Sequence, residues 1–109
     1  MKRISRFTKQ EISEIFKKAR RAVRRPGLDI LCAPAAKKTG RILVITPRKV
    51  GSAPQRNLVR RRLKAIFYEK KLFERGFDCV VIVKKPGVLL TFETLGDLLE
   101  LASRKMEQK

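Results

Sequence analysis

Residues 52–64, SAPQRNLVRRRLK, combine side chains whose types and spacing suit the binding of phosphate. Five of the nine residues from Arg56 to Lys64 are basic, and Asn57 lies among them. No acidic residue occurs between positions 52 and 68, whereas a helix made only for solubility would alternate Glu and Lys at i, i+4 to gain pair energy. An asparagine adds a directional donor and acceptor that solubility does not need. The stretch therefore predicts phosphate contact rather than a solvated charged surface.

The same stretch is predicted to form a helix with two separate faces. Ser52 followed three residues later by Gln55 is a capping-box pattern. At 100° per residue, one arc of about 100° collects the apolar residues Val59, Leu63, Ile66 and Phe67. A second arc collects the polar residues Asn57, Arg60, Arg61 and Lys64. Upstream, Arg48 and Lys49 precede Gly51, and a glycine before a helix start lets a phosphate approach the backbone closely.

The charge of the whole chain favours the same kind of partner. There are 28 Lys and Arg against 10 Asp and Glu, a formal net charge of +18. Self-repulsion of that size is easiest to understand if a polyanion neutralises it, and nucleic acid is the leading candidate. A membrane is disfavoured because apolar runs such as Cys79 to Val83 fall far below the ~20 residues of a spanning helix. With no signal peptide visible after MKRISRF, we expect a cytoplasmic protein.

Residues suited to metal binding or covalent catalysis are sparse. The chain has no histidine, and its two cysteines, Cys32 and Cys79, are isolated in apolar runs, which excludes the usual zinc sets and most nucleophile–base pairs. The cysteines are expected to be small buried hydrophobic residues, the alternative being a strained cross-strand disulfide. The carboxylates, among them Asp29, Asp78 and Asp97, lack paired spacing, which argues against a metal-dependent nuclease.

The elements that must position the basic helix begin with an N-terminal helix. Thr8 and Glu11 form a capping-box pattern at its start, and Pro26 and Gly27 are expected to end it. Its apolar positions at helical spacing are Ile12, Ile15, Phe16, Ala19 and Val23. The basic residues near its end also suit the negative end of the helix dipole, so part of this charge has a structural explanation.

Strands and a further helix complete the predicted domain. Leu28–Ala33 and Arg41–Thr46 are predicted to form a hairpin joined by a polar link, and Cys79–Val83 a third, buried strand. A C-terminal helix presents one apolar stripe formed by Leu95, Leu98, Leu99, Ala102 and Met106. No internal repeat or linker is visible, so residues 1–109 are expected to form one mixed α/β domain.

The segment RKVGSAPQRNLVRRRLKAIF, residues 48–67, resembles the signature of the bacterial ribonuclease P protein subunit. In that family a basic, Lys-containing stretch with a glycine leads into an Arg-Asn-Arg helix with an apolar end. The resemblance extends over most of the chain, because the other predicted elements, FDCVVIVKKP among them, follow in the family's order. It implies a two-layer α/β (α+β) sandwich with a central mixed sheet, like the second domain of ribosomal protein S5, and a left-handed βαβ crossover around the basic helix.

The resemblance also assigns roles to individual residues. The residues implied to bind the RNA subunit are Arg48, Lys49, Arg56, Asn57, Arg60, Arg61, Arg62 and Lys64. Those implied to bind the 5′ leader of precursor tRNA, in a cleft between the N-terminal helix and the sheet, are Phe16, Ile12, Lys17 and Arg20. Phe16 would stack on a leader base or, alternatively, be an ordinary core aromatic. Leu58 replaces an arginine of the family pattern and Ile12 replaces an aromatic residue.

The function implied is that of a ribonuclease P subunit that assists endonucleolytic removal of the 5′ leader. Catalysis is expected in the RNA subunit, with Mg²⁺ bound there and no cofactor bound by the protein's side chains. The expected partners are ribonuclease P RNA and precursor tRNA, with no obligate protein partner evident. A ribosomal protein or a general RNA chaperone is the alternative that the same composition permits.

Overall fold

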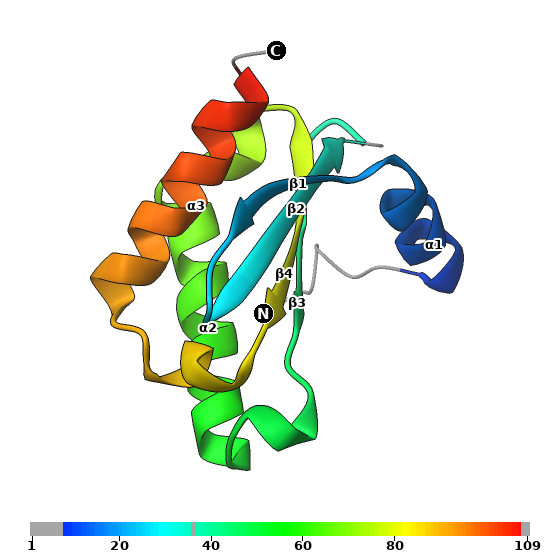
Figure 1. The fold of residues 1–109 in the computed structure, drawn as a ribbon. Coiled ribbons are helices and arrows are strands. Elements are labelled where there is room, and N and C mark those ends of the chain that lie inside the picture. Colours follow the sequence, from blue (N-terminus) through cyan, green and yellow to red (C-terminus); the bar gives the residue numbers. More distant parts are fainter. Residues whose placement is uncertain (1–7, 36, 108–109) are drawn as a thin grey trace.

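The structure is a computed structural model that describes residues 8–35 and 37–107. Its sheet has the strand order β1-β2-β4-β3 (Figure 1). The strands are β1 (Arg20–Arg24), β2 (Leu28–Pro34), β3 (Ile42–Ile45) and β4 (Phe77–Val83). The helices are α1 (Lys9–Lys18), α2 (Ala53–Glu69) and α3 (Phe92–Glu107), with short 3-10 turns at Arg48–Val50, Leu72–Glu74 and Lys85–Leu89.

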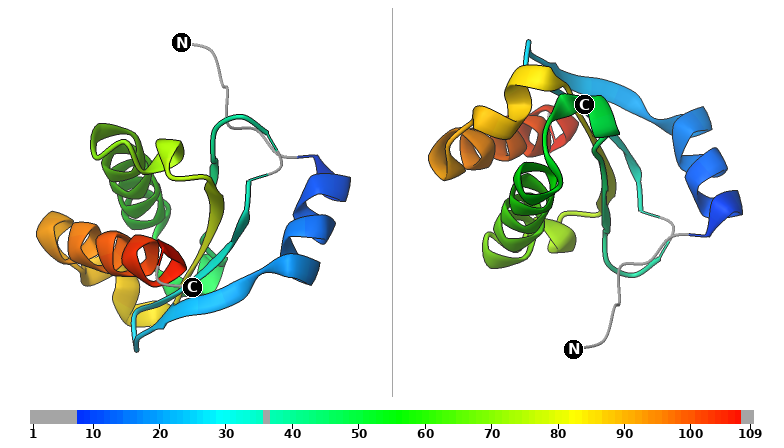
Figure 2. Two further views of the ribbon diagram at one scale, coloured as in Figure 1. Left: turned by 90° about the horizontal axis from the view of Figure 1, so that it is seen from above. Right: turned by 90° about the horizontal axis from the view of Figure 1, so that it is seen from below.

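Helices lie on both faces of this sheet. Figure 2 shows α2 and α3 side by side on one face and α1 alone on the other. The main core lies under α2 and α3, where Leu63 of α2 and Leu99 of α3 are fully buried against strand residues such as Ile30. A smaller cluster lies under α1, where Ile15 packs with Ala33 and Val80. The predicted fold class, an α+β fold with helices packed on a mixed sheet, is confirmed.

The central strand explains why the predicted hairpin of residues 28–33 and 41–46 is wrong. β2 and β3 do not pair with each other, because β4 lies between them, antiparallel to β2 and parallel to β3. β4 is buried at all but one of its residues, and a strand that is buried on both faces is typical of the interior of a sheet, where it has a neighbour on each edge. The parallel pair β3–β4, connected through α2, is the predicted βαβ unit; its left-handed sense stays a prediction.

Gly40, in the link between β2 and β3, shows how closely this link passes over β4. A Cβ atom at this position would lie 1.9 Å from the carbonyl oxygen of Phe77. Only a residue without a side chain leaves room for that approach. The polar link is therefore not a hairpin turn but a crossing that brings β3 to the far side of β4.

The N-terminal helix is shorter than its apolar periodicity predicts. α1 ends at Lys18, the backbone of Ala19 is extended, and residues 20–24 form edge strand β1, antiparallel to β2. Pro26 and Gly27 occupy the hairpin turn between these strands, closed by the Arg25 N–H donating to the Leu28 carbonyl at 2.9 Å. Helical periodicity was misleading here because hairpin pairing with β2, itself held in the sheet by β4, decides the conformation of this segment.

The C-terminal helix and the cysteine environment match the sequence predictions. Leu95, Leu99 and Ala102 of the predicted stripe are fully buried in α3. Cys32 and Cys79 are free, buried and opposite each other on β2 and β4, with their sulfur atoms 3.7 Å apart. The contact with Cys32, together with burial, raises the pKa of the Cys79 thiol well above its usual range. Both residues are therefore small core side chains, as predicted.

Candidate nucleic-acid interface

The start of α2 is fixed by the predicted capping box. The Gln55 N–H donates to the Ser52 hydroxyl at 3.3 Å, and the Ser52 N–H donates to the Gln55 side-chain oxygen at 2.9 Å. A Cβ atom on Gly51 would lie 2.8 Å from that same oxygen, so the glycine leaves room for the reciprocal bond. Pro54 lies in the first turn, where its missing N–H has no cost. These contacts set the helix entry and hence the direction of its polar face.

The two predicted faces of α2 are confirmed by burial. Val59, Leu63, Ile66 and Phe67 are each at most 2% exposed and lie in the main core. On the other side, Asn57, Arg61 and Lys64 are exposed and Arg60 is half-buried. Arg48 and Lys49 are exposed in the 3-10 turn just before the helix, while Arg56 and Arg62 are half-buried at its flanks. Leu58 is 39% exposed, which leaves an apolar side chain on the α2 surface.

Arg60 is held in place by two neutral partners. Its guanidinium donates to the Asn57 side-chain oxygen at 3.0 Å and also to the hydroxyl of Thr46, which directly follows β3. Arg56 donates from Nε to the Gly51 carbonyl at 3.2 Å. These bonds orient the guanidinium groups without neutralising them. Thr46 has no sequence signal of its own, because its contact with Arg60 depends on how β3 and α2 pack.

The side chains predicted to bind the RNA subunit are not neutralised by carboxylates of the described residues. In the described part of the chain, none of the eight side chains named for this role takes part in an ion pair. Cations whose field is not cancelled by neighbouring carboxylates attract an external polyanion most strongly. We call the polar face formed by Asn57, Arg60, Arg61 and Lys64 the basic face of α2.

A second candidate surface lies on the face of the sheet that carries α1. Beyond the buried contact of Ile15 with Ala33 and Val80, this face presents half-buried apolar side chains, which we call the open floor. The open floor consists of Leu31, Leu43, Ile45 and Ile82. Apolar side chains left partly exposed in the middle of a sheet offer a surface on which bases can lie.

The four residues predicted to bind the leader differ in where they lie. Phe16 is 42% exposed on α1, so it is not a core aromatic, and Lys17 beside it is exposed. Ile12, one turn earlier, is half-buried. Arg20 pairs with Cys32, whose side chain lies in the core under α2 and α3, so the Arg20 side chain leaves the strand on the face opposite α1. The structure therefore brings Phe16, Ile12 and Lys17 together on α1 but does not bring Arg20 to the same face.

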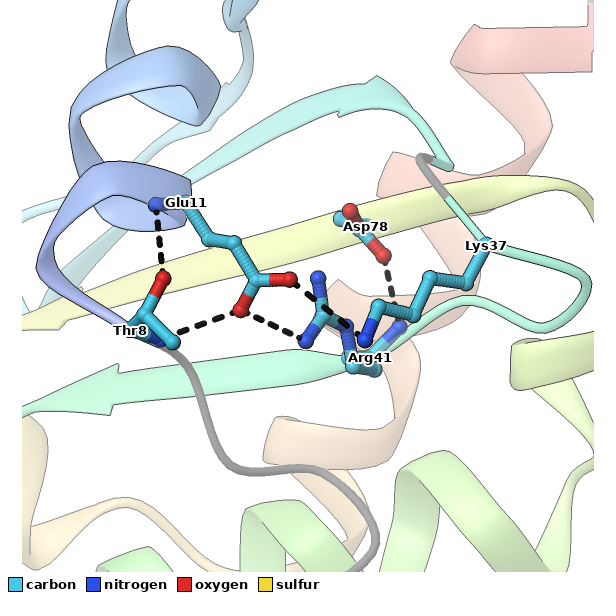
Figure 3. A network of polar contacts seen from close by, with 5 residues as sticks. All are labelled: Thr8, Glu11, Lys37, Arg41 and Asp78. Carbon is cyan, nitrogen blue, oxygen red and sulfur yellow. Dashed lines mark hydrogen bonds and ion pairs between the residues drawn. The ribbon is translucent and has the colours of Figure 1, made fainter.

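An ion-pair network attaches α1 to the sheet (Figure 3). Glu11 accepts from the Arg41 guanidinium at 3.1 Å and pairs with Lys37 at 3.5 Å, while the Arg41 backbone N–H donates to Asp78 at 2.8 Å. Glu11 also closes the capping box with Thr8. The backbone bond from Thr8, followed by the bond from Arg41, lowers the pKa of Glu11 to about 2. The carboxylate is therefore charged at every physiological pH, and α1 is held over one end of the sheet.

A hollow of about 120 Å³ lies between α1 and this end of the sheet. Its lining includes Glu14, Ile15 and Lys18 of α1 and Pro34 of β2, together with Glu11, Arg41 and Asp78 of the ion-pair network. None of the four residues predicted to bind the leader lines it. The hollow is lined by carboxylates and a buried arginine. A nucleic-acid base therefore fits the apolar open floor better than it fits this hollow.

Comparison with known proteins places this chain in one family. The family model Ribonuclease P matches residues 1–107. The ribonuclease P protein component of Chloroflexus aurantiacus is 31% identical over 90 residues, 82% of this chain and 67% of that protein. That of Bacillus pumilus is 28% identical over 107 residues, 96% of this chain and 90% of that protein.

Solved structures agree with these sequence matches. The RNase P protein of Thermotoga maritima superposes with a TM-score of 0.74 at 25% identity, covering 94% of this chain and 97% of the other. The RNase P protein of Staphylococcus aureus gives a TM-score of 0.78 over 97% of both chains, and at 19% identity it supports the fold alone. With the family model spanning nearly its whole length, this chain belongs to the ribonuclease P protein family.

Proposed function

We propose that this chain is the protein subunit of ribonuclease P, which binds the catalytic RNA subunit and the 5′ leader of precursor tRNA and assists endonucleolytic removal of that leader. The observation that carries the proposal is the basic face of α2, whose cations are oriented but not neutralised. Family membership supports the same role.

The basic face of α2 would bind the phosphates of the RNA subunit. Arg60 is already fixed by Asn57 and Thr46, so it loses little side-chain freedom when it meets a phosphate. Arg61 and Lys64 lie on the same arc and add positive charge along the helix. The bond that Arg60 donates to Asn57 also keeps the guanidinium spread over the surface of the helix. Affinity should therefore come from preorganised phosphate contacts and fall steeply with salt.

The open floor and Phe16 would bind the leader. Bases of a single strand stack on exposed aromatic rings and lie against apolar surface, with about 1–3 kcal/mol per stacked base. Such contacts tolerate any sequence, as a subunit that serves many precursor tRNAs requires. The attachment of α1 through Glu11 and Arg41 holds Phe16 at a fixed place beside the sheet.

The Mg²⁺ that supports the cleavage chemistry is assigned to the RNA subunit. Within residues 8–35 and 37–107, no group of three potential ligand side chains is close enough together to hold a metal ion. The contribution of this chain is electrostatic and positional: it neutralises phosphates where two RNA molecules meet and holds the leader beside them. Both effects should lower the concentration of Mg²⁺ needed for cleavage.

Binding to a bacterial ribonuclease P RNA at several salt concentrations tests the role of α2. The double variant Arg60→Ala and Arg61→Ala should reduce the slope of log affinity against log salt by about 1.4 to 1.8, because each lost phosphate contact contributes about 0.7 to 0.9. Arg104→Ala with Lys105→Ala removes the same charge from exposed positions on α3 and should change the slope much less. Equal slopes for the two double variants would contradict the proposal.

A general RNA chaperone is the second candidate, favoured by the net charge of +18 alone. Such a protein would bind RNA with a similar dependence on salt but would have no reason to distinguish precursor tRNAs by leader length. Half-saturating concentrations for precursors with short and long leaders therefore separate the two functions. Equal values for all leaders, with tight RNA binding, would favour the chaperone.

A further inference from the structure

Edge strand β1 contains a β-bulge that changes the direction of its arginines. The pairing of β1 with β2 shifts between Arg21 and Val23, so Ala22 is an extra residue without a partner. In a regular strand, residues three apart point to opposite faces of the sheet. The bulge instead brings Arg21 and Arg24 to the same face, and it leaves Ala22 and Val23 both buried.

Two rows of facing residues then cross the α1 face of the sheet. The first row consists of Leu43, Val80, Leu31 and Arg21. The second row consists of Ile45, Ile82, Asp29 and Arg24. Each row starts with an apolar side chain on β3 and ends with an arginine on β1, about 14 Å away at three strand spacings of about 4.8 Å. The open floor is therefore bordered along β1 by two arginines.

The charges of these two arginines are not neutralised by carboxylates of the described residues. Both are exposed, and in the part of the chain that the structure describes neither takes part in an ion pair. The nearest carboxylate in the second row, that of Asp29, is paired with Lys84 at 3.0 Å. Arg25, the next residue after β1, is also exposed and adds to the positive charge at this edge. The β1 edge therefore attracts anions independently of α2.

The opposite border of the open floor is continuous with the basic face of α2. Thr46 follows Ile45 directly at the end of β3, and its hydroxyl accepts from Arg60. A leader that leaves the RNA subunit bound at α2 would reach the open floor at Ile45. Crossing the floor along the rows, it would then meet Arg24 and Arg21 at β1.

We infer that Arg21 and Arg24 form a second phosphate site, which binds the backbone of the precursor tRNA leader upstream of the nucleotides that lie on the open floor. The inference rests on the proposed function and extends it: the leader enters at the border next to α2, where the RNA subunit is bound, lies against apolar side chains in the middle and is held by β1 at the other border. The β1 contact is made only by leaders long enough to cross the sheet.

Leader length and charge together provide the test. The holoenzyme is assembled from this chain and a bacterial ribonuclease P RNA, and its half-saturating concentration is measured by single-turnover cleavage of precursors with leaders of about two and about twelve nucleotides. Arg21→Gln with Arg24→Gln should raise that concentration about tenfold for the long leader and change it little for the short one. The salt slope for the long leader should fall by about 1.4, corresponding to two single-strand phosphate contacts.

Three further proteins make the result specific. Arg104→Gln with Lys105→Gln removes two exposed charges from α3 and should behave as wild type for both leaders. Arg21→Lys with Arg24→Lys keeps the charge and should retain most of the salt slope. Arg24→Gln alone should show about a threefold effect on the long leader, and it provides the test if the double variant has an altered melting curve.

The outcomes separate the inference from the proposed function. If wild type distinguishes the two leaders and the glutamine variants do so equally well, the β1 site is wrong while the proposed function stands. If the glutamine variants bind both precursors more weakly, or bind the RNA subunit alone more weakly, the arginines contact that RNA instead, which also overturns the inference. If wild type does not distinguish the leaders at all, leader binding fails and the β1 site fails with it.

Discussion

The two faces of the sheet use residues from the same strands but are covered to different extents. Toward α2 and α3, Leu28, Ile30 and Cys32 of β2 are completely buried. Toward α1, Leu31, which lies between Ile30 and Cys32 on the same strand, is half-buried and belongs to the open floor. The closed face thus contributes most of the stability, which leaves the other face free to expose apolar surface for a ligand.

The largest expected effect on stability lies on the closed face. Leu63→Ala removes a side chain that is completely buried between α2 and the sheet. It should lower the free energy of unfolding by about 2 to 5 kcal/mol, because the burial of the removed atoms is lost and a cavity is left in the core. Thermal or urea denaturation measures this, and a nearly unchanged midpoint would mean that the core does not lie under α2.

A matched change on the open floor should have a smaller effect on stability and a larger one on binding. Leu43→Ala removes the same atoms from a half-buried position, so about 1 kcal/mol is expected. Affinity for a precursor tRNA with a long leader should nevertheless fall, because the apolar contact is lost. If Leu43→Ala destabilised the protein as much as Leu63→Ala and left precursor affinity unchanged, the contrast between the two faces would be wrong.

The smallest expected effect concerns the attachment of α1, the helix that covers one end of the open face of the sheet. Glu11→Gln keeps the capping box but removes the charge that pairs with Arg41 and Lys37. The pKa of Glu11 is lowered from 4.5 to about 2 in the folded protein, so its charge stabilises the fold above pH 4.5 and this contribution is lost as pH falls toward 2.

Melting curves of wild type and Glu11→Gln across this pH range measure the effect. The wild type should melt at the higher temperature near neutral pH, and the difference should shrink below pH 4.5. A difference that stays constant down to pH 2 would show that the charge of Glu11 does not attach α1.

The sequence could predict features that depend on local spacing but not those that depend on pairing between strands. The faces of α2 were predictable, because an amphipathic helix records its burial at local spacing, as Leu63 and Arg61 show. Strand β1 was not, because Val23 fits a helical stripe equally well and only pairing with β2 makes it a strand residue. The position of β4 between β2 and β3 also depends on contacts between distant segments.

The candidate site follows the same rule. The basic face of α2 lies within one helix, so its residues could be named from the sequence. The contact of Arg60 with Thr46 and the bulge at Ala22 arise from tertiary packing, and no local pattern indicates them. For the same reason Arg20, assigned to the leader by resemblance, leaves β1 on the other face of the sheet, whereas Arg21 and Arg24 border the open floor.

The central claim is that this chain supports the RNA subunit through the basic face of α2. Single-turnover cleavage of a precursor tRNA by a bacterial ribonuclease P RNA at low Mg²⁺, with and without the protein, tests it most directly. The account predicts that wild type restores correct 5′ maturation and that the double variant Arg60→Ala and Arg61→Ala, although folded, does not. No restoration by wild type with any tested RNA, despite tight binding, would contradict it.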